Sequence, residues 1–439
     1  MQDPFFLLHI LKQGRDKVNI KFILSIGYGL CWFFFSLYFA LIWGREISDE
    51  LPVIYVWWVI IGIALLPGFL MNTMFFSNLL NQKMKHYPNT DEDITLLLCD
   101  HNEEVNIKET IQSILNQKYL GHIRVIVVDN ASTDKTKEMV CSMRKDVPCQ
   151  CTLEYTFCKE LGKSKALNHG LRFVNTNYFL TVDADTCLEK HAVQNIMNHI
   201  VYKKSACVAA NLFVKNTNDS FISKIQTYDY LLSIASVKRF QGSYHSTLVA
   251  QGAFSAYKTA VVKSMNGWKD VMGEDIVLTY EILNKKLAST YEPSAVGYTK
   301  VPATFDGLYN QRKRWAIGMI EGLSFIPPWK QTGFYPKFFT TINLSVIYLD
   351  LAFLFGFIPG VILAFLGYYY FIGFLTLFTI IFCILLYATM YLYQKKLHIE
   401  FQNSISGFVG FLLFFQFIQS ISSLHGYCIR LFHRKEQWK

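Results

Sequence analysis

Four long segments of this chain contain no Asp, Glu, Lys or Arg, and they limit its fold more than any other feature. They run from residue 23 to 44, 51 to 82, 351 to 394 and 403 to 429. Roughly 20 helical residues cross a bilayer core about 30 Å thick, so these segments have room for about one, one, two and one spans. Buried helices of a large soluble core are the alternative, but such helices rarely reach this length without a charge. The sequence therefore predicts a multi-pass membrane protein.

Basic residues near the predicted spans indicate the orientation of the chain. They are Lys12, Arg15, Lys17 and Lys21 before the first span, Lys83 and Lys85 after the second, and Lys330 and Lys337 before the third. Lys and Arg are enriched in cytoplasmic loops. We therefore expect the N-terminus and the large polar domain to face the cytoplasm, with the spans in the cell membrane.

The number of C-terminal spans stays open between three and four. Three would put the basic tail, residues 430–439, outside the cell, against the charge rule. A fourth would bring the tail inside, but Asp350 would then lie within the membrane and need a polar partner. The predicted organisation is a cytosolic N-terminus (1–19), two spans (20–82), a polar domain (83–303), an interfacial helical segment (304–337), three or four spans (338–429) and the tail (430–439).

Charge and cysteine content narrow the class of ligand. The net charge of +9 suits anionic lipid head groups and phosphorylated substrates. Nucleic-acid binding is the rival interpretation, but no recognition motif accompanies the charge, so we expect no nucleic-acid partner. The cysteines between 141 and 158 lack Cys-x-x-Cys spacing, and a cytosolic domain predicts reduced thiols.

The polar domain alternates strand and helix patterns. Apolar runs at 94–99, 123–128 and 178–182 read as buried strands, with helical spacing of apolar residues after the first. Ser132 and Thr133 offer N-caps for a helix after the second strand. The alternation predicts an α/β fold with a mostly parallel, Rossmann-like sheet and helices on both faces. Ligands of such sheets bind beyond the carboxyl ends of the strands.

Acidic residues lie at that edge of the predicted sheet. Asp129 ends the second strand, and Asp183 and Asp185 follow the third. Two carboxylates one residue apart can share a hard cation such as Mg²⁺ or Mn²⁺, which prefers oxygen ligands and often bridges a diphosphate. A solvated turn is the alternative for Asp-x-Asp alone, since Asp favours turns. Asp129 on the neighbouring strand end favours the functional interpretation.

Glu274 and Asp275 open a further predicted helix, directly after Gly273. The helix dipole stabilises carboxylates in this position, which is a sufficient structural explanation. An ionised acid within hydrogen-bond reach of an acceptor hydroxyl is also what a general base requires. Lys163 follows a glycine in the segment 162–170 and can meet a phosphate or line a donor cleft; the alternative is a solvated basic helix start.

The sequence Gln311-Arg312-Lys313-Arg314-Trp315 comes shortly before the third uncharged segment. Arginine binds diphosphate bidentately, and an indole face stacks well on a sugar ring. The alternative is an anchor at the membrane boundary, where Trp, Lys and Arg are enriched.

Taken in order, these motifs make the chain resemble the inverting glycosyltransferases of family 2, in particular the membrane-embedded processive synthases of poly-β-1,6-N-acetylglucosamine, hyaluronan, chitin and cellulose. The resemblance is strongest toward the first of these. It covers about residues 94–330 and is carried by segments 127–134, 162–170, 183–185, 251–254, 273–275 and 311–315. It implies a glycosyltransferase A-type domain embedded in a multi-span helical membrane protein. Departures from the usual pattern are Cys99-Asp100-His101 for Pro-x-Tyr, Asn130 for a second aspartate and Gly273 for a threonine.

The resemblance also implies roles for single residues. Asp275 would be the general base, beside Glu274. Donor and nucleotide contacts would come from Asn102, Glu103, Asp129, Lys163 and Asp183, the divalent metal would lie on Asp183 and Asp185, and Gln311, Arg312, Arg314 and Trp315 would hold the diphosphate and the acceptor sugar.

The function expected from the resemblance is inverting transfer from a UDP-sugar. It would polymerise N-acetylglucosamine or a related hexose into a polysaccharide that leaves through the spans. Two other classes stay open: a non-processive transferase that adds one sugar to a membrane lipid, and a transporter or sensor that only binds UDP-sugars. The expected partners are the UDP-sugar donor, a glycan or lipid acceptor and membrane lipids, and the need for a small membrane subunit is left open.

Overall fold

The computed structural model describes residues 4–84 and 86–432, with side chains from residue 18 onward. The chain divides into two units. We call the first the apolar unit (Met1–Met84, Ser345–Phe401 and Leu412–Leu424) and the second the polar unit (Lys85–Leu344, Gln402–Phe411 and His425–Lys439). The predicted tail from residue 433 onward, Lys85 and the first three residues lie outside the described residues.

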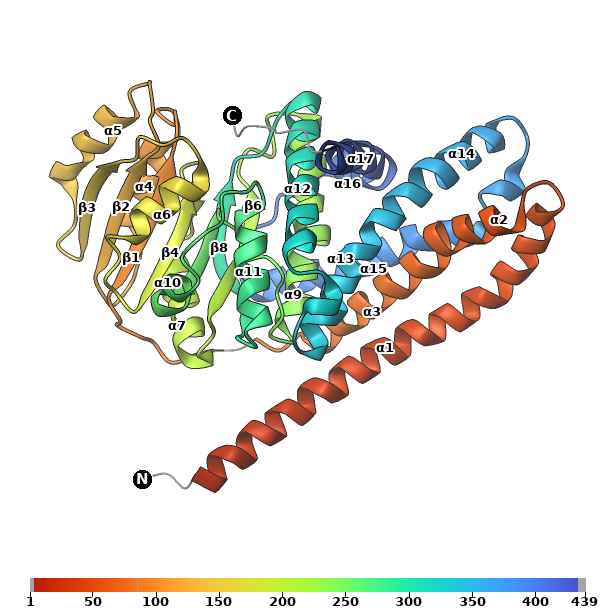
Figure 1. The fold of residues 1–439 in the computed structure, drawn as a ribbon, viewed down its shortest axis with the longest axis horizontal. Helices are drawn as coiled ribbons and strands as arrows, with labels where there is room; N and C mark the ends of the chain where they lie inside the picture. The colour runs from red at the N-terminus through yellow and green to blue at the C-terminus, as the bar shows by residue number, and fades with distance from the viewer. Residues whose placement is uncertain (1–3, 85, 433–439) are drawn as a thin grey trace. The chain divides into compact units, whose positions relative to one another are not determined.

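The polar unit is built on one eight-stranded sheet in the order β3-β2-β1-β4-β7-β6-β8-β5 (Figure 1). Its strands are β1 (Ile94–Asp100), β2 (Ile123–Asp129), β3 (Cys151–Phe157), β4 (Tyr178–Asp183), β5 (Thr186–Leu188), β6 (Cys207–Val214), β7 (Phe254–Lys258) and β8 (Ser289–Thr299). The pairs β2–β3, β1–β2, β1–β4 and β6–β8 are parallel, whereas β7 is antiparallel to both of its neighbours. This confirms the mostly parallel α/β sheet that the sequence predicts.

Helices cover both faces of this sheet. Along β1, Leu96 and Leu98 pack with α4 and α7 on one face, while Leu97 packs with α6 and α11 on the other, and all three side chains are buried. Burial on both faces explains why the strand sequence is continuously apolar. The helices of this unit are α4 (Ile107–Leu115), α5 (Thr136–Ser142), α6 (Lys163–Leu171), α7 (Ala192–Lys203), α8 (Phe221–Asp229), α9 (Ser236–Gly242), α10 (Thr259–Ser264), α11 (Glu274–Asn284), α12 (Phe305–Phe325) and α16 (Ile405–Gly410).

The predicted cap of the helix after β2 is wrong. Helix α5 begins at Thr136, and the Asp134 carboxylate accepts a hydrogen bond from the Thr136 N–H at 3.0 Å. Ser132 and Thr133 are used differently. The Ser132 hydroxyl accepts from the Asn102 N–H, and the Asn102 side-chain oxygen accepts from the Thr133 N–H. These residues therefore tie the loop after β2 to the loop after β1 instead of starting a helix.

The apolar unit holds long apolar helices. The helices that lie in this unit or enter it are α1 (Pro4–Ser48), α2 (Val53–Ile60), α3 (Leu66–Leu80), α13 (Phe334–Ala352), α14 (Ile358–Phe365), α15 (Phe378–Lys396) and α17 (Gln416–Leu431). Among the described residues, five segments are long and apolar enough to cross a membrane: Val18–Ser48, Val53–Leu80, Phe334–Phe365, Phe374–Lys396 and Ile405–Leu431. Three of them follow the polar domain, and the number of C-terminal spans stays a prediction.

Asp350 has polar partners in the apolar unit. It lies on α13, where its carboxylate accepts a hydrogen bond from the Ser420 hydroxyl at 2.7 Å and from the Gln416 amide at 3.5 Å. Its side chain is buried. A carboxylate inside a membrane-spanning helix is costly unless it is paired. These contacts are the kind of polar partner expected for Asp350 if α13 crosses a membrane.

Candidate active site

A cavity of about 640 Å³ opens in the polar unit beyond the carboxyl ends of β1 and β4. It lies where open α/β sheets bind their ligands, and its volume falls in the usual range of ligand sites, about 300–1,000 Å³. The predicted site residues that line it are Glu103, Lys163, Asp183, Asp185, Glu274, Asp275, Gln311, Arg314 and Trp315. Segments far apart in the sequence therefore meet at one cavity.

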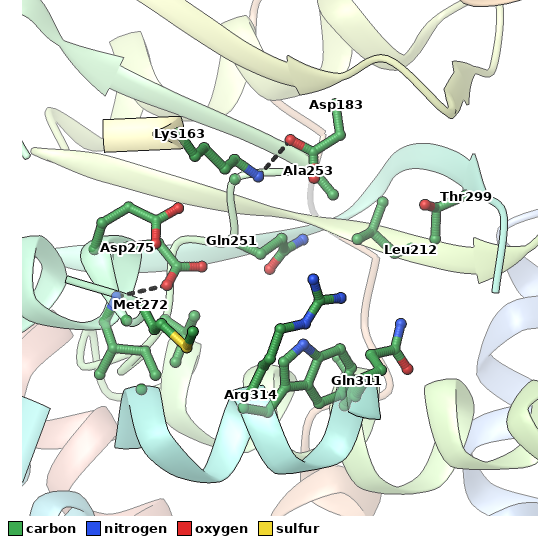
Figure 2. Close-up of a pocket in the computed structure, with 18 of the residues that line it drawn as sticks. Lys163, Asp183, Leu212, Gln251, Ala253, Met272, Asp275, Thr299, Gln311 and Arg314 are labelled. Carbon is green, nitrogen blue, oxygen red and sulfur yellow. Dashed lines mark hydrogen bonds and ion pairs between the residues drawn. The ribbon is translucent and has the colours of Figure 1, made fainter. Parts of the chain in front are cut away.

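Lys163 and Asp183 form one wall of the cavity (Figure 2). The Lys163 ammonium lies 2.6 Å from the Asp183 carboxylate. Although burial disfavours the charged ammonium, the Asp183 carboxylate raises the pKa of Lys163, so it stays protonated. A fixed cation beside an acid at the end of β4 suits the phosphates of a nucleotide donor.

Asp185 carries the surplus negative charge of this wall. Its carboxylate accepts hydrogen bonds from the hydroxyls of Thr186 at 3.1 Å and Thr299 at 3.2 Å. Burial, followed by the charges of Asp183 and Glu103, raises the pKa of Asp185 to about 6. A cation bound here would relieve that repulsion.

The residues at this wall fit a divalent cation held jointly by protein and substrate. Among the described residues, no group of three or more His, Cys, Asp or Glu side chains is arranged to hold a metal by itself. Mg²⁺ is commonly bound by one or two carboxylates, with water and substrate phosphates completing its shell. Asp183 and Asp185 can supply those two carboxylates.

Glu274 and Asp275 reach the cavity because two glycines let their helices meet. Gly273, the residue just before α11, lies so close to Gly318 of α12 that a Cβ on Gly273 would be 2.5 Å from the Gly318 carbonyl oxygen. The Gly273 N–H also donates to the Glu321 carboxylate at 3.0 Å. A threonine, usual at this position in the resembling family, has no room here. The glycine therefore sets the position of both acids.

The two acids differ in their environment. Burial, and then the charge of Asp275, raises the pKa of Glu274 to about 8, so Glu274 is protonated at neutral pH. Burial also raises the pKa of Asp275, but the ammonium groups of Lys163 and Lys238 act in the opposite direction. Asp275 also accepts a hydrogen bond from the Ile276 N–H at 2.8 Å. Because these cations and this N–H favour the carboxylate form of Asp275, Asp275 is the acid suited to be the base.

Helix α12 forms the opposite wall. It begins after Thr304, whose hydroxyl caps the Gly307 N–H at 3.2 Å. Figure 2 shows Gln311 and Arg314 reaching from this helix into the cavity. Trp315 also lines the cavity and keeps 40% of its surface exposed. The wall thus offers a guanidinium for anionic oxygens and an indole face for an apolar sugar face.

Three predicted contact residues do not line the cavity. The Asp129 carboxylate is buried and accepts from the Tyr155 hydroxyl and the Ser132 N–H, at 2.6 and 2.8 Å. Asn102 holds the adjoining loops together, as described above. Arg312, predicted to hold diphosphate or acceptor, is instead buried against Asp229 at 2.7 Å. Its place on α12, one residue after Gln311, turns it away from the cavity.

Lys238 and Asp100 are ionisable lining residues that the sequence did not predict as part of the site. Lys238 lies on α9 with 8% of its surface exposed, and burial lowers its pKa to about 7. Asp100 ends β1, where its carboxyl oxygens are buried without a hydrogen-bond partner other than its own backbone N–H. The only sign of Asp100 in the sequence is that it lies in Cys99-Asp100-His101, where the resembling family has Pro-x-Tyr. For Lys238 there was none, because Val-Lys-Arg on a helix reads as a solvated surface.

We predict that Asp100→Asn stabilises the protein at neutral pH. Burial, followed by the charge of Asp129, raises the pKa of Asp100 to about 8. The folded state therefore holds a proton that the unfolded chain releases above about pH 4, and stability falls by roughly 1.4 kcal/mol per pH unit up to the folded pKa. The neutral amide removes this loss, up to roughly 4 kcal/mol at pH 7. Thermal unfolding of the purified protein at pH 5.5, 7 and 8 tests this: the gain should grow with pH, and a gain that does not change with pH contradicts it.

Comparison with known proteins gives a family match over part of the chain. The family model for glycosyl transferase family 2 matches residues 95–265. A poly-beta-1,6-N-acetyl-D-glucosamine synthase of Staphylococcus aureus (strain COL) is 29% identical over 232 residues, covering 52% of this chain and 54% of that protein. Its counterpart in Staphylococcus epidermidis is 29% identical over 268 residues, covering 60% and 62%. The chain thus spans little more than half the length of these curated relatives.

Among solved structures, a mannosyltransferase of Pyrobaculum calidifontis in complex with GDP-Man and Mn²⁺ aligns with a TM-score of 0.53 and 18% sequence identity. The alignment covers 84% of this chain and 99% of that one. At this identity the likeness concerns the fold alone. It agrees with the α/β sheet of the polar unit.

Proposed function

We propose that this chain, whose residues 95–265 match the family model of glycosyl transferase family 2, is a membrane-bound inverting glycosyltransferase that transfers N-acetylglucosamine from UDP-N-acetylglucosamine and builds a β-linked polymer. One observation carries the proposal: a buried base candidate, an acid pair suited to a cation and an arginine–tryptophan wall surround a single cavity. The names of the Staphylococcus relatives support the donor sugar and the polymeric product. The five candidate spans support a membrane location.

The reaction is a single displacement. Asp275 accepts the proton of an acceptor hydroxyl, whose oxygen forms a bond to the anomeric carbon of the α-linked donor. The bond from that carbon to the diphosphate oxygen breaks, and its electron pair leaves with UDP. Attack from the opposite face gives the β-linkage.

Cationic side chains stabilise the leaving UDP. Lys163 is fixed on one side of the cavity and Arg314 reaches in from the other, so both can meet charge that develops on the diphosphate. A divalent cation on Asp183 and Asp185 would add Lewis-acid stabilisation of the same oxygens. Trp315 offers the acceptor sugar a stacking face. Glu103 also lines the cavity and adds to its negative charge.

We further propose that the polar unit faces the cytoplasm, where UDP-sugars are made, and that the polymer leaves through the spans. The Lys and Arg residues near the candidate spans support this orientation. The alternative of a single transfer to a membrane lipid uses the same cavity chemistry and differs in the product.

Product analysis tests the proposal. Membranes containing the full chain would be supplied with radiolabelled UDP-N-acetylglucosamine and Mg²⁺ or Mn²⁺, and the product would be sized. We expect long labelled chains that a β-N-acetylglucosaminidase degrades. Label confined to a small lipid would favour the single-transfer alternative, and no release of UDP from any UDP-sugar would contradict the proposal.

A further inference from the structure

Arg312 and Asp229 form a buried ion pair behind the cavity wall. Their side chains are 3% and 1% exposed, and the guanidinium lies 2.7 Å from the carboxylate. The Ser233 side chain also hydrogen-bonds the Asp229 carboxylate. Neither charged residue lines the cavity. A buried charge is costly unless it is paired with an opposite charge. Because neither residue can contact a ligand in the cavity, the pair must have another role.

The same guanidinium lies under Trp315. The Arg312 Cζ atom is 4.0 Å from the centre of the indole ring, well within the range of a cation–π contact. Trp315 is 40% exposed and lines the cavity. One side of the indole therefore rests on a buried cation, while part of its surface stays exposed at the cavity.

Asp229 fixes where this cation sits. It is the last residue of α8, directly before a π-helical turn at Tyr230–Ala235. Such wide turns are frequent at functional sites. Tyr230, Ser233 and Ile234 of this turn line the cavity. The carboxylate thus links the wall made by the π-helical turn to the wall made by α12.

We propose that Asp229 is a positioning residue that acts through Arg312 to hold the Trp315 indole as the platform for the acceptor sugar. The inference rests on the proposed function for the identity of the acceptor. The planar guanidinium is held by the carboxylate and in turn limits the rotation of the indole. Binding of a sugar to an indole that is already fixed avoids the cost of ordering that side chain. Arg312 and Trp315 are three residues apart on α12 and so lie on one face of the helix, and Asp229 holds the guanidinium that lies against the indole there.

Two single variants separate positioning from a purely structural role. Arg312→Lys keeps a cation near Asp229 but loses the flat surface under the indole. Asp229→Asn keeps the shape of the carboxyl but loses its charge. With radiolabelled UDP-N-acetylglucosamine and a short β-linked N-acetylglucosamine oligosaccharide as acceptor, we expect the acceptor KM to rise about three- to tenfold. The affinity for UDP and the kcat at saturating acceptor should stay within about twofold of the wild type.

A double variant and a control guard against loss of folding. Asp229→Leu combined with Arg312→Met removes both charges, which buried pairs often tolerate, and should give the same rise in acceptor KM. The control is Glu292→Gln, which weakens another buried pair, Glu292 with His199 at 2.7 Å, whose residues do not line the cavity. It should leave the acceptor KM unchanged. Variants with a wild-type acceptor KM would overturn the inference.

Fluorescence tests the platform without any transfer reaction. Acrylamide quenching of the indole is taken as the difference between each protein and its Trp315→Phe counterpart. We expect Arg312→Lys and Asp229→Asn to raise the quenching of Trp315 about twofold, because the indole is no longer held against the guanidinium. A wild type without turnover contradicts the proposed function alone. Unchanged quenching in both variants overturns the positioning role.

Discussion

Replacing Asp275 by Asn is expected to lower kcat by about 10²–10⁴-fold, the usual contribution of a general base. The carboxylate lies in the cavity at the start of α11, close to the ammonium groups of Lys163 and Lys238. These cations favour its ionised form, which is the form that accepts a proton. Asn has the same shape but cannot take the proton. The affinity for UDP should change little, because the substitution acts on the acceptor side.

The matched control is Glu274→Gln at the neighbouring position. Glu274 is buried and its pKa is raised to about 8, so it is already neutral at pH 7. An amide then resembles the native group, and we expect kcat to fall by less than about tenfold. Rates of UDP release and of labelled product formation, measured for both variants at pH 7, make the comparison. If Glu274→Gln loses more activity than Asp275→Asn, the assignment of the base is wrong.

Local sequence patterns predicted those parts of the site that depend on one stretch of the sequence alone. Strands β1, β2 and β4 and the helix opened by Glu274 appear where the apolar runs and the acidic motif placed them. The acids gather because parallel strands end at one edge of the sheet. Gly273, noted only as a departure, allows α11 to meet Gly318 of α12. The sequence could mark the glycine but not its partner, because that contact depends on tertiary packing.

Local sequence patterns do not predict which side chains of α12 face the cavity, or which single charged side chains are buried. Gln311, Arg314 and Trp315 line the cavity, but Arg312 in the same motif points to Asp229. Helical geometry turns neighbouring residues about 100° apart, and only the packed structure tells which side faces the ligand. Lys238 and Asp100 were missed for the same reason, since burial of a charged side chain leaves no local pattern. The number of C-terminal spans stays open in the sequence, because the distribution of Lys and Arg favours four spans whereas the length of the apolar segments favours three.

Removal of divalent cations is expected to lower the rate of transfer by about 10³-fold, since stabilisation of a leaving diphosphate by a metal is worth several kcal/mol and each 1.4 kcal/mol is tenfold. The acidic wall of the cavity explains the need. Asp183 is shared with Lys163, and Asp185 lies among other acids that raise its pKa. A diphosphate brought to this wall without a cation would meet net repulsion.

Asp185→Asn should therefore weaken the response to metal more than it weakens binding of the acceptor. We expect the concentration of Mn²⁺ for half-maximal rate to rise by about tenfold or more, since loss of groups that only support metal ligands already costs 10–100-fold. Asp219→Asn is the control, because Asp219 is absent from the cavity lining and its carboxylate accepts from Asn216 instead. The measurement is UDP release during titration with Mn²⁺ after treatment with EDTA. Full activity of the chelated wild type would mean that the acid pair serves the donor without a metal and that Lys163 and Arg314 carry the leaving group alone. An unchanged titration in Asp185→Asn would mean that Asp185 does not hold the metal.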